Sequence, residues 1–486
     1  MYLGIDVGTS SVKALLIDDK QTVIGMASAP LEVSRPQAGW SEQAPGDWWI
    51  ATNTAVATLK RSHPKELAAV EGIGLSGHMH GATLLGKDDK TLRPCILWND
   101  GRSGAECAEI EATCPNSRKI AGNIAMAGFT APKLLWVKKH EPKIFAGIAK
   151  VLLPKDYVRL LMTGDHASDM SDSAGTLWLD VARRDWSDEL LTATSLTRAH
   201  MPKLYEGSAP TGRLRVDVAE DWGTPKRPVV AGGGGDNAAS ACGIGAVKPG
   251  AGFLSLGTSG VLFVSNAKFS PNTAGAVHAF CHAIPDTWHQ MGVILSATGS
   301  LEWLAGLLAE PLPKLIGALG DDIGAPSPVL FLPYLSGERT PHNDPSVRGV
   351  FVGLGHESDR AAMTRAVIEG VAFAVRDCRE VLKAAGTKIE SLMAVGGGSR
   401  SKLWLRIIAT LLDTPLLLPE HAEAGGALGA ARLGMAAATG SDPIAICAAP
   451  PVAAIIEPSK PHRAAYEAAY QRYKKLYPAI KGVMSA

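Results

Sequence analysis

The residues YLGIDVGTSSVKALLID (2–18) are matched about half a chain later by GAGFLSLGTSGVLFVS (250–265). Each stretch is an apolar run, a Gly-Thr-Ser tripeptide, a small residue and a second apolar run that opens on Val. A glycine and two hydroxyl residues between apolar, β-branched runs predict a strand, a tight turn and a second strand. Two matched copies in a chain of 486 residues predict duplicated domains.

Each half also holds a later glycine turn. PVVAGGGGDNAA (228–239) and LMAVGGGSRSKLW (392–404) both predict a strand, a glycine loop and a helix, with Asp236 or Ser399 as the N-cap. We take these two turns as equivalent. The Gly/Pro-containing segment 243–250 predicts the domain boundary, which gives domains 1–245 and 246–486. The first half is longer between its two turns, so insertions are expected at 28–62 and 100–220.

Strands and helices alternate elsewhere, which predicts an α/β protein with parallel or mixed sheets. The apolar runs predict buried strands at 70–77 and 327–335, and helices at 131–145 and 359–386. Residues 423–438, EAGGALGAARLGMAAA, predict a small-residue helix able to approach another backbone closely. Tyr466, Tyr470 and Tyr473 recur at helical spacing and predict a packing stripe.

Composition excludes several classes of protein. Lys+Arg 48 against Asp+Glu 47 leaves a formal charge of +1, so neither nucleic acid nor an anionic membrane is an expected partner. The seven cysteines are scattered without metal-ligand spacing, which indicates free thiols in a reducing compartment. No basic residue precedes Lys13 and no apolar run reaches 18 residues. We therefore expect no signal peptide, no membrane span and a cytoplasmic location.

The glycine turns suit phosphate binding, because a glycine turn presents backbone N–H groups to an anion at close range. Two facing Gly-Thr-Ser turns could hold different phosphates of one nucleotide, and the 396–398 turn leaves bare backbone for a nucleoside. An ordinary hairpin is the alternative for a single copy. Neither a P-loop nor a dinucleotide fingerprint is present, since GGGGDNAA lacks the Lys-Ser/Thr ending. A dehydrogenase is therefore disfavoured.

Two acids stand beside these turns. Asp236 follows four glycines at the start of a predicted helix, where it could accept a proton, the alternative being simple N-capping. Asp6 interrupts an apolar strand and needs a cation or hydrogen-bond donors. Mg²⁺ or its bound water beside a nucleotide would supply that partner, and an Asp bonded to its own turn is the alternative.

A third group of polar residues suits a polyhydroxylated ligand. GLSGHMHGATLL (74–85) places His78, Met79 and His80 after a buried strand, and ILWNDGRS (96–103) adds an indole, amide, carboxylate and guanidinium. Any one of these residues is more often structural. A metal site on the two histidines is disfavoured because no acid or cysteine lies near them in sequence.

The chain resembles the FGGY carbohydrate kinases of the actin/Hsp70-like ATPase superfamily, nearly end to end. The motifs that carry the resemblance, apart from the turns, are GFTAPKLLWVKKH (128–140), GVFVGLGHESDRAAMTRAVIE (349–369), WSEQAPGDWW (40–49), SGHMHGA (76–82), WNDGR (98–102), LPKDY (153–157) and YLSGERTPHND (334–344). Ala362 stands where the family usually has a polar residue, and His78 where close relatives have Gln.

The resemblance implies two RNase H-like domains around a central cleft, with ATP and Mg²⁺ as cofactors and a small sugar as substrate. It implies ATP-dependent phosphorylation of the 5-hydroxyl of D-xylulose, with Asp236 as general base and Asp6 as the essential acid near Mg²⁺. The implied sugar-binding residues are Met79, His80, Trp98, Asp100, Arg102, Asp236 and Asn237. The implied ATP-binding residues are Gly8, Thr9, Ser10, Lys13, Gly257, Thr258, Ser259, Gly396, Gly397, Gly398 and Ser399.

Two alternatives stay open at this point. A kinase of the same family for ribulose, a polyol or gluconate would share the phosphate turns and differ only around residues 76–102. An actin-like or chaperone-like ATPase would share the nucleotide site and need no sugar pocket. A homodimer is compatible with the sequence, which does not decide the oligomeric state.

Overall fold

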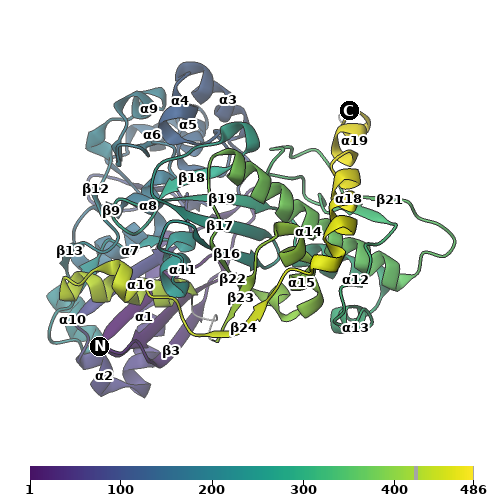
Figure 1. Ribbon diagram of the computed structural model, residues 1–486. Helices are drawn as coiled ribbons and strands as arrows, with labels where there is room; N and C mark the ends of the chain where they lie inside the picture. The colour runs from purple at the N-terminus through teal and green to yellow at the C-terminus, as the bar shows by residue number, and fades with distance from the viewer. Residues whose placement is uncertain (421–424, 485–486) are drawn as a thin grey trace.

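The computed structural model describes residues 1–420 and 425–484, arranged as two lobes that each contain a mixed β-sheet (Figure 1). The strands of the first sheet run in the order β13 (Pro210–Arg213), β14 (Val229–Ala231), β5 (Gly72–Gly77), β1 (Tyr2–Val7), β2 (Ser11–Ile17), β3 (Val23–Pro30), with β15 (Gly234–Gly235) also on β5. Those of the second run in the order β18 (His278–Cys281), β19 (Trp288–Ile294), β17 (Gly260–Asn266), β16 (Ala251–Leu256), β22 (Ser391–Val395), β23 (Leu416–Pro419), β24 (Val452–Ile456).

The two sheets share a topology, which confirms the predicted duplication. β1 and β16 each form an antiparallel hairpin with the next strand across a Gly-Thr-Ser turn, and each pairs in parallel with a later strand on its other side, β5 or β22. β14 and β23 then extend the sheets in parallel. The alternating strands and helices thus build two α/β lobes of one design.

This topology corrects the predicted equivalence of the two later glycine turns. The turn after β22 occupies the place that follows β5 in the first sheet, whereas the turn after β14 corresponds to the segment after β23. Accordingly, α11 (Asp236–Ile244) and α16 (Gly425–Thr439) are the equivalent helices, and they pack against each other. A strand followed by glycines looks the same in sequence at either position, so composition could not separate them.

The predicted insertions are right for part of one segment and wrong for the other. Within 100–220, the elements outside the main sheet include α3 (Gly104–Thr113), α4 (Ser117–Ala121), α5 (Thr130–His140), α6 (Pro142–Ala146), β8 (Lys150–Leu152), β9 (Ala167–Asp169), α8 (Met170–Ala174), β10 (Leu179–Asp180), β11 (Asp185–Trp186), α9 (Asp188–Ala193) and β12 (Lys203–Tyr205). In the same segment, α7 (Pro154–Thr163) and α10 (Val216–Trp222) add residues to the core of the first sheet, and β13 is one of its strands, so these parts belong to the first lobe. Residues 28–62, by contrast, include α1 (Pro45–Ser62), which packs on β2 and β3 as part of the first lobe. Trp48 of this helix is fully buried.

The remaining elements are short or belong to the second lobe. They are β4 (Glu42–Gln43), α2 (Pro64–Ala68), β6 (Thr83–Leu85), β7 (Cys95–Ile96), α12 (Thr298–Leu308), α13 (Leu312–Gly317), β20 (Leu330–Leu332), β21 (Val350–Val352), α14 (Arg360–Ala384), α15 (Lys402–Leu412), α17 (Pro443–Ile446), α18 (Arg463–Tyr473) and α19 (Leu476–Met484). The predicted helix at 131–145 is broken at Glu141, because Pro142 begins a new turn. The helix predicted at 359–386 is α14, and the strand at 327–335 shrinks to β20.

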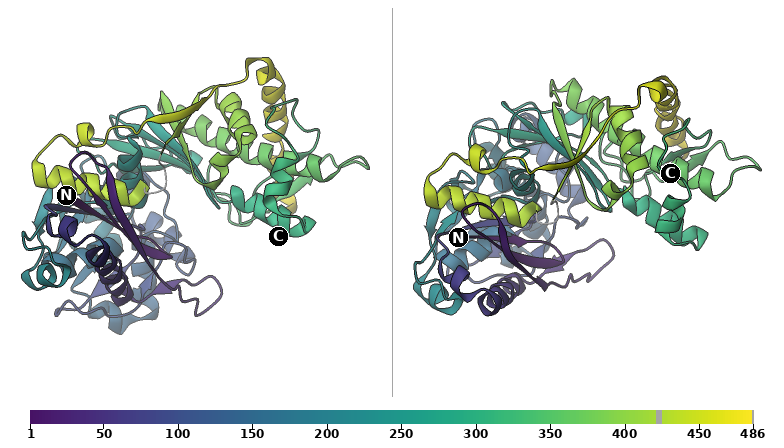
Figure 2. Two further views of the ribbon diagram at one scale, coloured as in Figure 1. Left: turned by 90° about the horizontal axis from the view of Figure 1, so that it is seen from below. Right: turned by 60° about the horizontal axis from the view of Figure 1, so that its bottom comes forward.

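The small-residue helix is α16, which begins at Gly425; residues 423 and 424 of the prediction lie outside the described part of the chain. It leaves the second lobe and lies along the first sheet (Figure 2). A methyl group added at Gly4 of β1 or at Gly74 of β5 would collide with backbone oxygens of α16, so only glycine permits this approach. The predicted close approach is therefore confirmed.

Hydrophobic cores join the lobes as well as filling them. The first sheet buries a core that includes Ile5 and Leu75, and the second buries one that includes Leu254 and the predicted tyrosine stripe of α18. A further core takes residues from both halves, with Phe129 on one side and Phe280 on the other. The two lobes are therefore in extensive apolar contact.

Candidate active site

Asp6 stands in register with the glycine loop that carries Asp236. Across β1, β5 and β15, Asp6 is opposite Ser76, and Ser76 is opposite Gly234. The Ser76 hydroxyl donates a hydrogen bond of 2.8 Å to Asp6 Oδ1. Burial raises the pKa of Asp6, while the Ser76 hydrogen bond and the charge of Lys13 lower it. Lys13 is the cross-strand partner of Asp6 on β2, so a cation lies beside this acid.

Asp236 is the first residue of α11, and Gly235 is its N-cap, which corrects the prediction that Asp236 caps the helix. Both hydrogen bonds from Asn237, 2.7 Å from the backbone N and 2.9 Å from Nδ2, go to Asp236 Oδ1. Burial raises the pKa of Asp236 to about 6, and the nearby charge of Asp6 adds to the rise. A carboxylate with this pKa is ionised at neutral pH and still a competent proton acceptor.

The His80 ring is held in one orientation. Its Nδ1 lies 2.6 Å from the carbonyl oxygen of Gly175, so Nδ1 carries the proton and Nε2 is an acceptor. Burial lowers the pKa of His80 to about 3, which keeps the ring neutral. Lys133 and Thr130 both bond the His80 carbonyl oxygen, at 2.9 and 3.1 Å. A neutral ring with a free acceptor nitrogen suits a sugar hydroxyl.

Met79 and His78 face in different directions. A methyl group added at Gly235 would lie 2.9 Å from Met79 Cγ, so Met79 packs against the loop before Asp236. His78 is buried in the core, its ring 5.6 Å from that of Trp48, and burial lowers its pKa to about 3. The Gln-to-His departure from close relatives therefore falls in the core.

The 98–102 segment divides into an exposed and a buried part. Trp98 is 43% exposed, and its Nε1 donates a hydrogen bond of 3.0 Å to Thr9 Oγ1 in the first Gly-Thr-Ser turn. Arg102 and Asp100 are joined at 2.6 Å with both side chains fully buried, and Arg102 also lies 2.7 Å from Glu42 and over the ring of Trp40. These two charges are satisfied within the protein and support the loop, while a sugar contact by either stays a prediction.

The second group of turns gathers on the second sheet. Methyl groups added at Gly396 and Gly398 would lie 2.7 Å from backbone or side-chain atoms of Leu256, the residue just before Gly257. Gly396 and Gly397 are exposed, as are Thr258 and Ser259. The first turn of α12 packs on Thr258, whose carbonyl oxygen accepts from the N–H groups of Ala297 and Gly299 at 2.7 and 3.1 Å. The predicted adenosine loop and the second phosphate turn are therefore neighbours.

The N-cap prediction at Ser399 is wrong. Gly397–Arg400 form a short 3₁₀ turn, and Ser401 caps α15 by accepting from the N–H of Trp404 at 3.3 Å. Ser399 instead donates a hydrogen bond of 2.7 Å to the Gly396 carbonyl oxygen, which closes the glycine loop on itself.

The residues present fit a magnesium nucleotide. Asp6 offers one carboxylate, and in the described chain no three acids, histidines or cysteines gather into a metal cage. Mg²⁺ commonly binds through one or two carboxylates, waters and substrate phosphates, which matches this single acid. A methyl group at Gly426 would lie 3.2 Å from the Asp6 carboxylate, so the first turn of α16 approaches the same place. The helix N-terminus there favours negative charge.

Three of these features escaped the sequence analysis. Ser76 and Gly426 lie far from Asp6 in sequence, and only strand pairing and the return of α16 bring them together. Arg339, in the GERTP part of a family motif, lies with Nη1 3.4 Å from His278 Nε2. The His278 and His80 rings both pack on Phe129, at 5.6 and 4.7 Å, so the second lobe reaches the surroundings of His80. The motif YLSGERTPHND (334–344), to which no residue role was assigned, was the signal in the sequence that could have identified Arg339.

The helices and the cysteines give two further facts. Among the helices of the described chain, none combines the length and apolar character needed to cross a bilayer. All seven cysteines are free thiols, as expected.

Comparison with known proteins identifies the family. Residues 1–243 and 252–438 match the N-terminal and C-terminal domains of the FGGY family of carbohydrate kinases. The chain is 49% identical over 487 residues to the xylulose kinase of Escherichia coli (strain K12), with 100% of both covered. It matches the crystal structure of a xyloylose kinase from Brucella ovis with a TM-score of 0.98, 58% identity and 99% of both chains covered.

The xylulose kinase of Rhodospirillum rubrum gives a TM-score of 0.92 at 29% identity, with 100% of both chains covered. These likenesses confirm the expected fold class, two RNase H-like lobes of the actin/Hsp70-like ATPase type. Two family models cover most of the sequence in the expected order. The chain belongs to the FGGY family and is a carbohydrate kinase.

Proposed function

We propose that this kinase transfers the γ-phosphoryl group of ATP to the 5-hydroxyl of D-xylulose. The observation that carries the proposal is the Asp236 carboxylate, with its pKa raised to about 6, on a loop packed against Met79. The Escherichia coli relative, 49% identical over the whole chain, is named a xylulose kinase, and the Brucella ovis structure, 58% identical over 99% of the chain, is named a xyloylose kinase. Both names support the choice of sugar.

In the proposed reaction, the sugar O5 forms a bond to the γ-phosphorus while the bond to the β–γ bridging oxygen breaks. The proton of the 5-hydroxyl passes to Asp236. His80 Nε2 accepts a hydrogen bond from a sugar hydroxyl, and Asn237 orients Asp236 through its two bonds to Oδ1. Because the transition state of phosphoryl transfer is loose, most of the rate enhancement comes from positioning and charge stabilisation.

On the nucleotide side, the proposal assigns the phosphates to the N–H groups and hydroxyls of Gly8, Thr9, Ser10, Gly257, Thr258 and Ser259, with Lys13 as their cation, and the adenosine to Gly396–Ser399. Mg²⁺, when bound near Asp6, supplies charge neutralisation of the phosphates. Movement about 243–250 closes the lobes and excludes water, which would otherwise compete as acceptor.

The test is ADP release with Mg·ATP against a panel of D-xylulose, D-ribulose, L-ribulose, glycerol, xylitol and gluconate. We expect a selective response to D-xylulose. Preference for another compound of the panel would support kinase activity but with a different substrate. No ADP release with any compound, with ATP binding intact, would overturn the proposal.

The same assay applied to Asp236→Ala tests the general base. We expect turnover to fall by about 10²- to 10⁴-fold because the proton acceptor is gone, with ATP binding retained because the phosphate turns are untouched. Near-normal turnover would remove Asp236 from the mechanism.

We further propose that the kinase works in the cytoplasm, which the seven free thiols support because thiols persist in reducing compartments. A homodimer stays a prediction, to be checked by sedimentation.

A further inference from the structure

The loop before Asp236 is clamped from several sides. β15 pairs with β5, and a methyl group at Gly235 would lie 2.9 Å from Met79 Cγ. On the opposite side, a methyl group at Gly234 would lie 3.3 Å from the Ser171 hydroxyl oxygen. Ser171 belongs to α8, a helix to which neither the sequence motifs nor the family comparison gave a role. The position of the catalytic carboxylate is therefore set in part by α8.

The Ser171 hydroxyl makes a directional connection between that helix and the loop. It donates a hydrogen bond of 2.5 Å to Asp169 Oδ2, so its lone pairs are free to accept. It accepts from the backbone N–H of Gly235 at 3.1 Å. Gly235 directly precedes Asp236, and this bond fixes the orientation of the peptide that opens α11.

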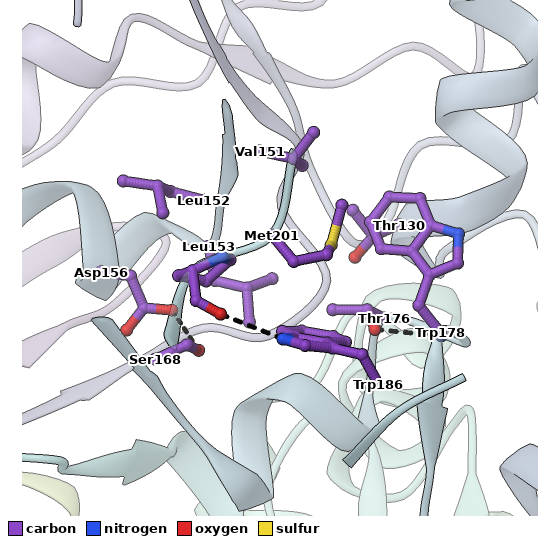
Figure 3. A pocket seen from close by; sticks show the side chains of 11 residues that line it. Thr130, Val151, Leu152, Leu153, Asp156, Ser168, Thr176, Trp178, Trp186 and Met201 are labelled. Carbon is purple, nitrogen blue, oxygen red and sulfur yellow. Dashed lines mark hydrogen bonds between the residues drawn. The ribbon is translucent and has the colours of Figure 1, made fainter. Parts of the chain in front are cut away.

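Buried charges hold α8 in place. Lys155 Nζ lies 2.6 Å from Asp156 and 2.7 Å from Asp169, and all three side chains are fully buried. Asp169 is also the N-cap of α8. Figure 3 shows the far side of this network, where the Ser168 hydroxyl bonds Asp156 at 2.5 Å beside a small cavity lined by Trp178 and Trp186. Moving α8 would unpair buried charges, which is strongly unfavourable.

The other end of α8 holds the sugar side of the site. The carbonyl oxygen of Gly175, which follows the helix, accepts the Nδ1 proton of His80 at 2.6 Å. A methyl group at Gly175 would lie 2.6 Å from Met79 Cε and 2.8 Å from His80 Cε1. The short helix α8 therefore contacts the loop before Asp236 through Ser171. At its C-terminal end it contacts His80, the proposed sugar-binding residue, through Gly175.

We propose that Ser171 is a positioning residue for the general base, and that α8 sets the separation between Asp236 and His80. The inference rests on the proposed role of Asp236. Ser171 acts only through the Gly235 N–H and through Asp169, and it touches no reacting atom.

The test compares two serine-to-alanine variants on the same helix. Ser171→Ala leaves the Gly235 N–H without its acceptor, so the loop loses a fixed orientation and the carboxylate is misplaced. Displacements of about 1 Å can cost about 10²-fold in rate. We expect kcat to fall by about 10- to 100-fold, with the KM for ATP unchanged because the Ser171 hydroxyl bonds Asp169 and Gly235 and not the phosphate turns.

Ser173→Ala is the matched control. Ser173 is equally buried on α8, but its hydroxyl bonds Ser168 at 2.9 Å and has no bond to the loop. We expect its kcat to stay within about twofold of the wild type at a comparable loss of thermal stability. If Ser171→Ala does not fold, Ser171→Cys, whose thiol is a weaker acceptor, carries the same expectation.

Asp236→Asn, assayed in parallel, distinguishes a failure of the Ser171 inference from a failure of the proposed function. If Asp236→Asn is inactive and the two serine variants lose kcat equally, the positioning role of Ser171 is overturned while the base assignment stands. If Asp236→Asn keeps near-normal turnover, the proposed function fails at its base, and the inference about Ser171 fails with it. A kcat loss confined to Ser171→Ala, with Asp236→Asn inactive, supports both.

Discussion

Asp236 uses its two oxygens unequally. Oδ1 takes both hydrogen bonds from Asn237, so Oδ2 is the oxygen left to accept a proton. Asn237 therefore orients the proposed base, in addition to its proposed contact with the sugar. If Asp236 is the base, its ionisation sets the pH dependence of the rate.

The pH dependence of kcat/KM follows from the pKa of about 6 at Asp236. The base works only when unprotonated, so kcat/KM should be level above about pH 7 and fall about tenfold per unit well below pH 6. Stopped assays at saturating ATP between pH 5 and 8 measure this. A level profile down to pH 5, with the protein folded throughout, would argue against Asp236 as the group that titrates.

His78 gives a prediction about stability. Burial lowers its folded pKa to about 3 from an ordinary value of 6.5, so below pH 6.5 the unfolded chain takes up a proton that the folded chain refuses. Stability is thus fully present above pH 6.5 and is lost as the pH falls. By this linkage, His78 alone should cost about 2 kcal/mol of unfolding free energy at pH 5.

His78→Phe, which keeps a ring beside Trp48, removes that cost. Relative to wild type, the variant should gain about 2 kcal/mol between pH 7.5 and pH 5, measured by urea unfolding at both values. An equal pH response in the two proteins would show that the pKa of His78 is not lowered in the folded state.

At the scale of elements, α16 depends on glycine at several of its closest backbone contacts, including Gly429 against α11. A methyl group added at Gly429 would collide with the Ala239 carbonyl oxygen of α11. Gly429→Ala should therefore push the two helices apart and destabilise the protein by about 1–3 kcal/mol. Thermal and urea unfolding measure the loss.

Gly306→Ala on α12 is the control. A methyl group there meets open space, and alanine is the better helix former by about 1 kcal/mol. We expect this variant to be neutral or slightly more stable. If both substitutions destabilise equally, close packing of α16 is not the reason for its glycines.

Features whose signal is local could be predicted from the sequence. The strand–turn–strand repeats, the small-residue helix and the place of Asp236 on its glycine loop each carry that signal within a short stretch of chain. Features that depend on strand pairing could not be predicted, because nothing near residue 396 indicates that its turn is equivalent to the segment after β5. The N-caps predicted at Asp236 and Ser399 are Gly235 and Ser401 in the structure, since cap positions shift by one or two residues with the backbone angles.

Long-range partners account for most of what was missed at the site. Ser171 is more than sixty residues from Gly235, and Gly426 is separated from Asp6 by almost the whole chain. The ion pairs of Arg102 with Asp100 and Glu42 likewise cannot be predicted from the WNDGR motif, which indicates sugar binding. Pattern supplies the type of chemistry, and packing decides which side chains remain free to perform it.

At the scale of the whole molecule, the first half is incomplete by itself. α16 covers β1 and β5, and the shared core joins Phe129 to Phe280. Residues 1–245 expressed alone should therefore expose apolar surface and fail to show a cooperative unfolding transition by circular dichroism. Co-expression with residues 246–486 should restore it.

A fusion of residues 1–245 through a flexible linker to the segment 425–447 tests which contact matters. Partial recovery of cooperativity would assign the defect to the missing α16. Cooperative unfolding of residues 1–245 alone would contradict the prediction and support the proposed boundary at 245 as that of an independent folding unit.

The return of α16 to the first sheet also constrains the order of synthesis. The helix emerges from the ribosome about 180 residues after Gly245, when most of the second lobe has already been made. At about 5–20 residues per second, the first sheet waits roughly 10–40 s for its cover. During that interval the face of β1 and β5 that α16 later covers is open to other chains, so we expect nascent copies of this kinase to bind chaperones that shield apolar surface.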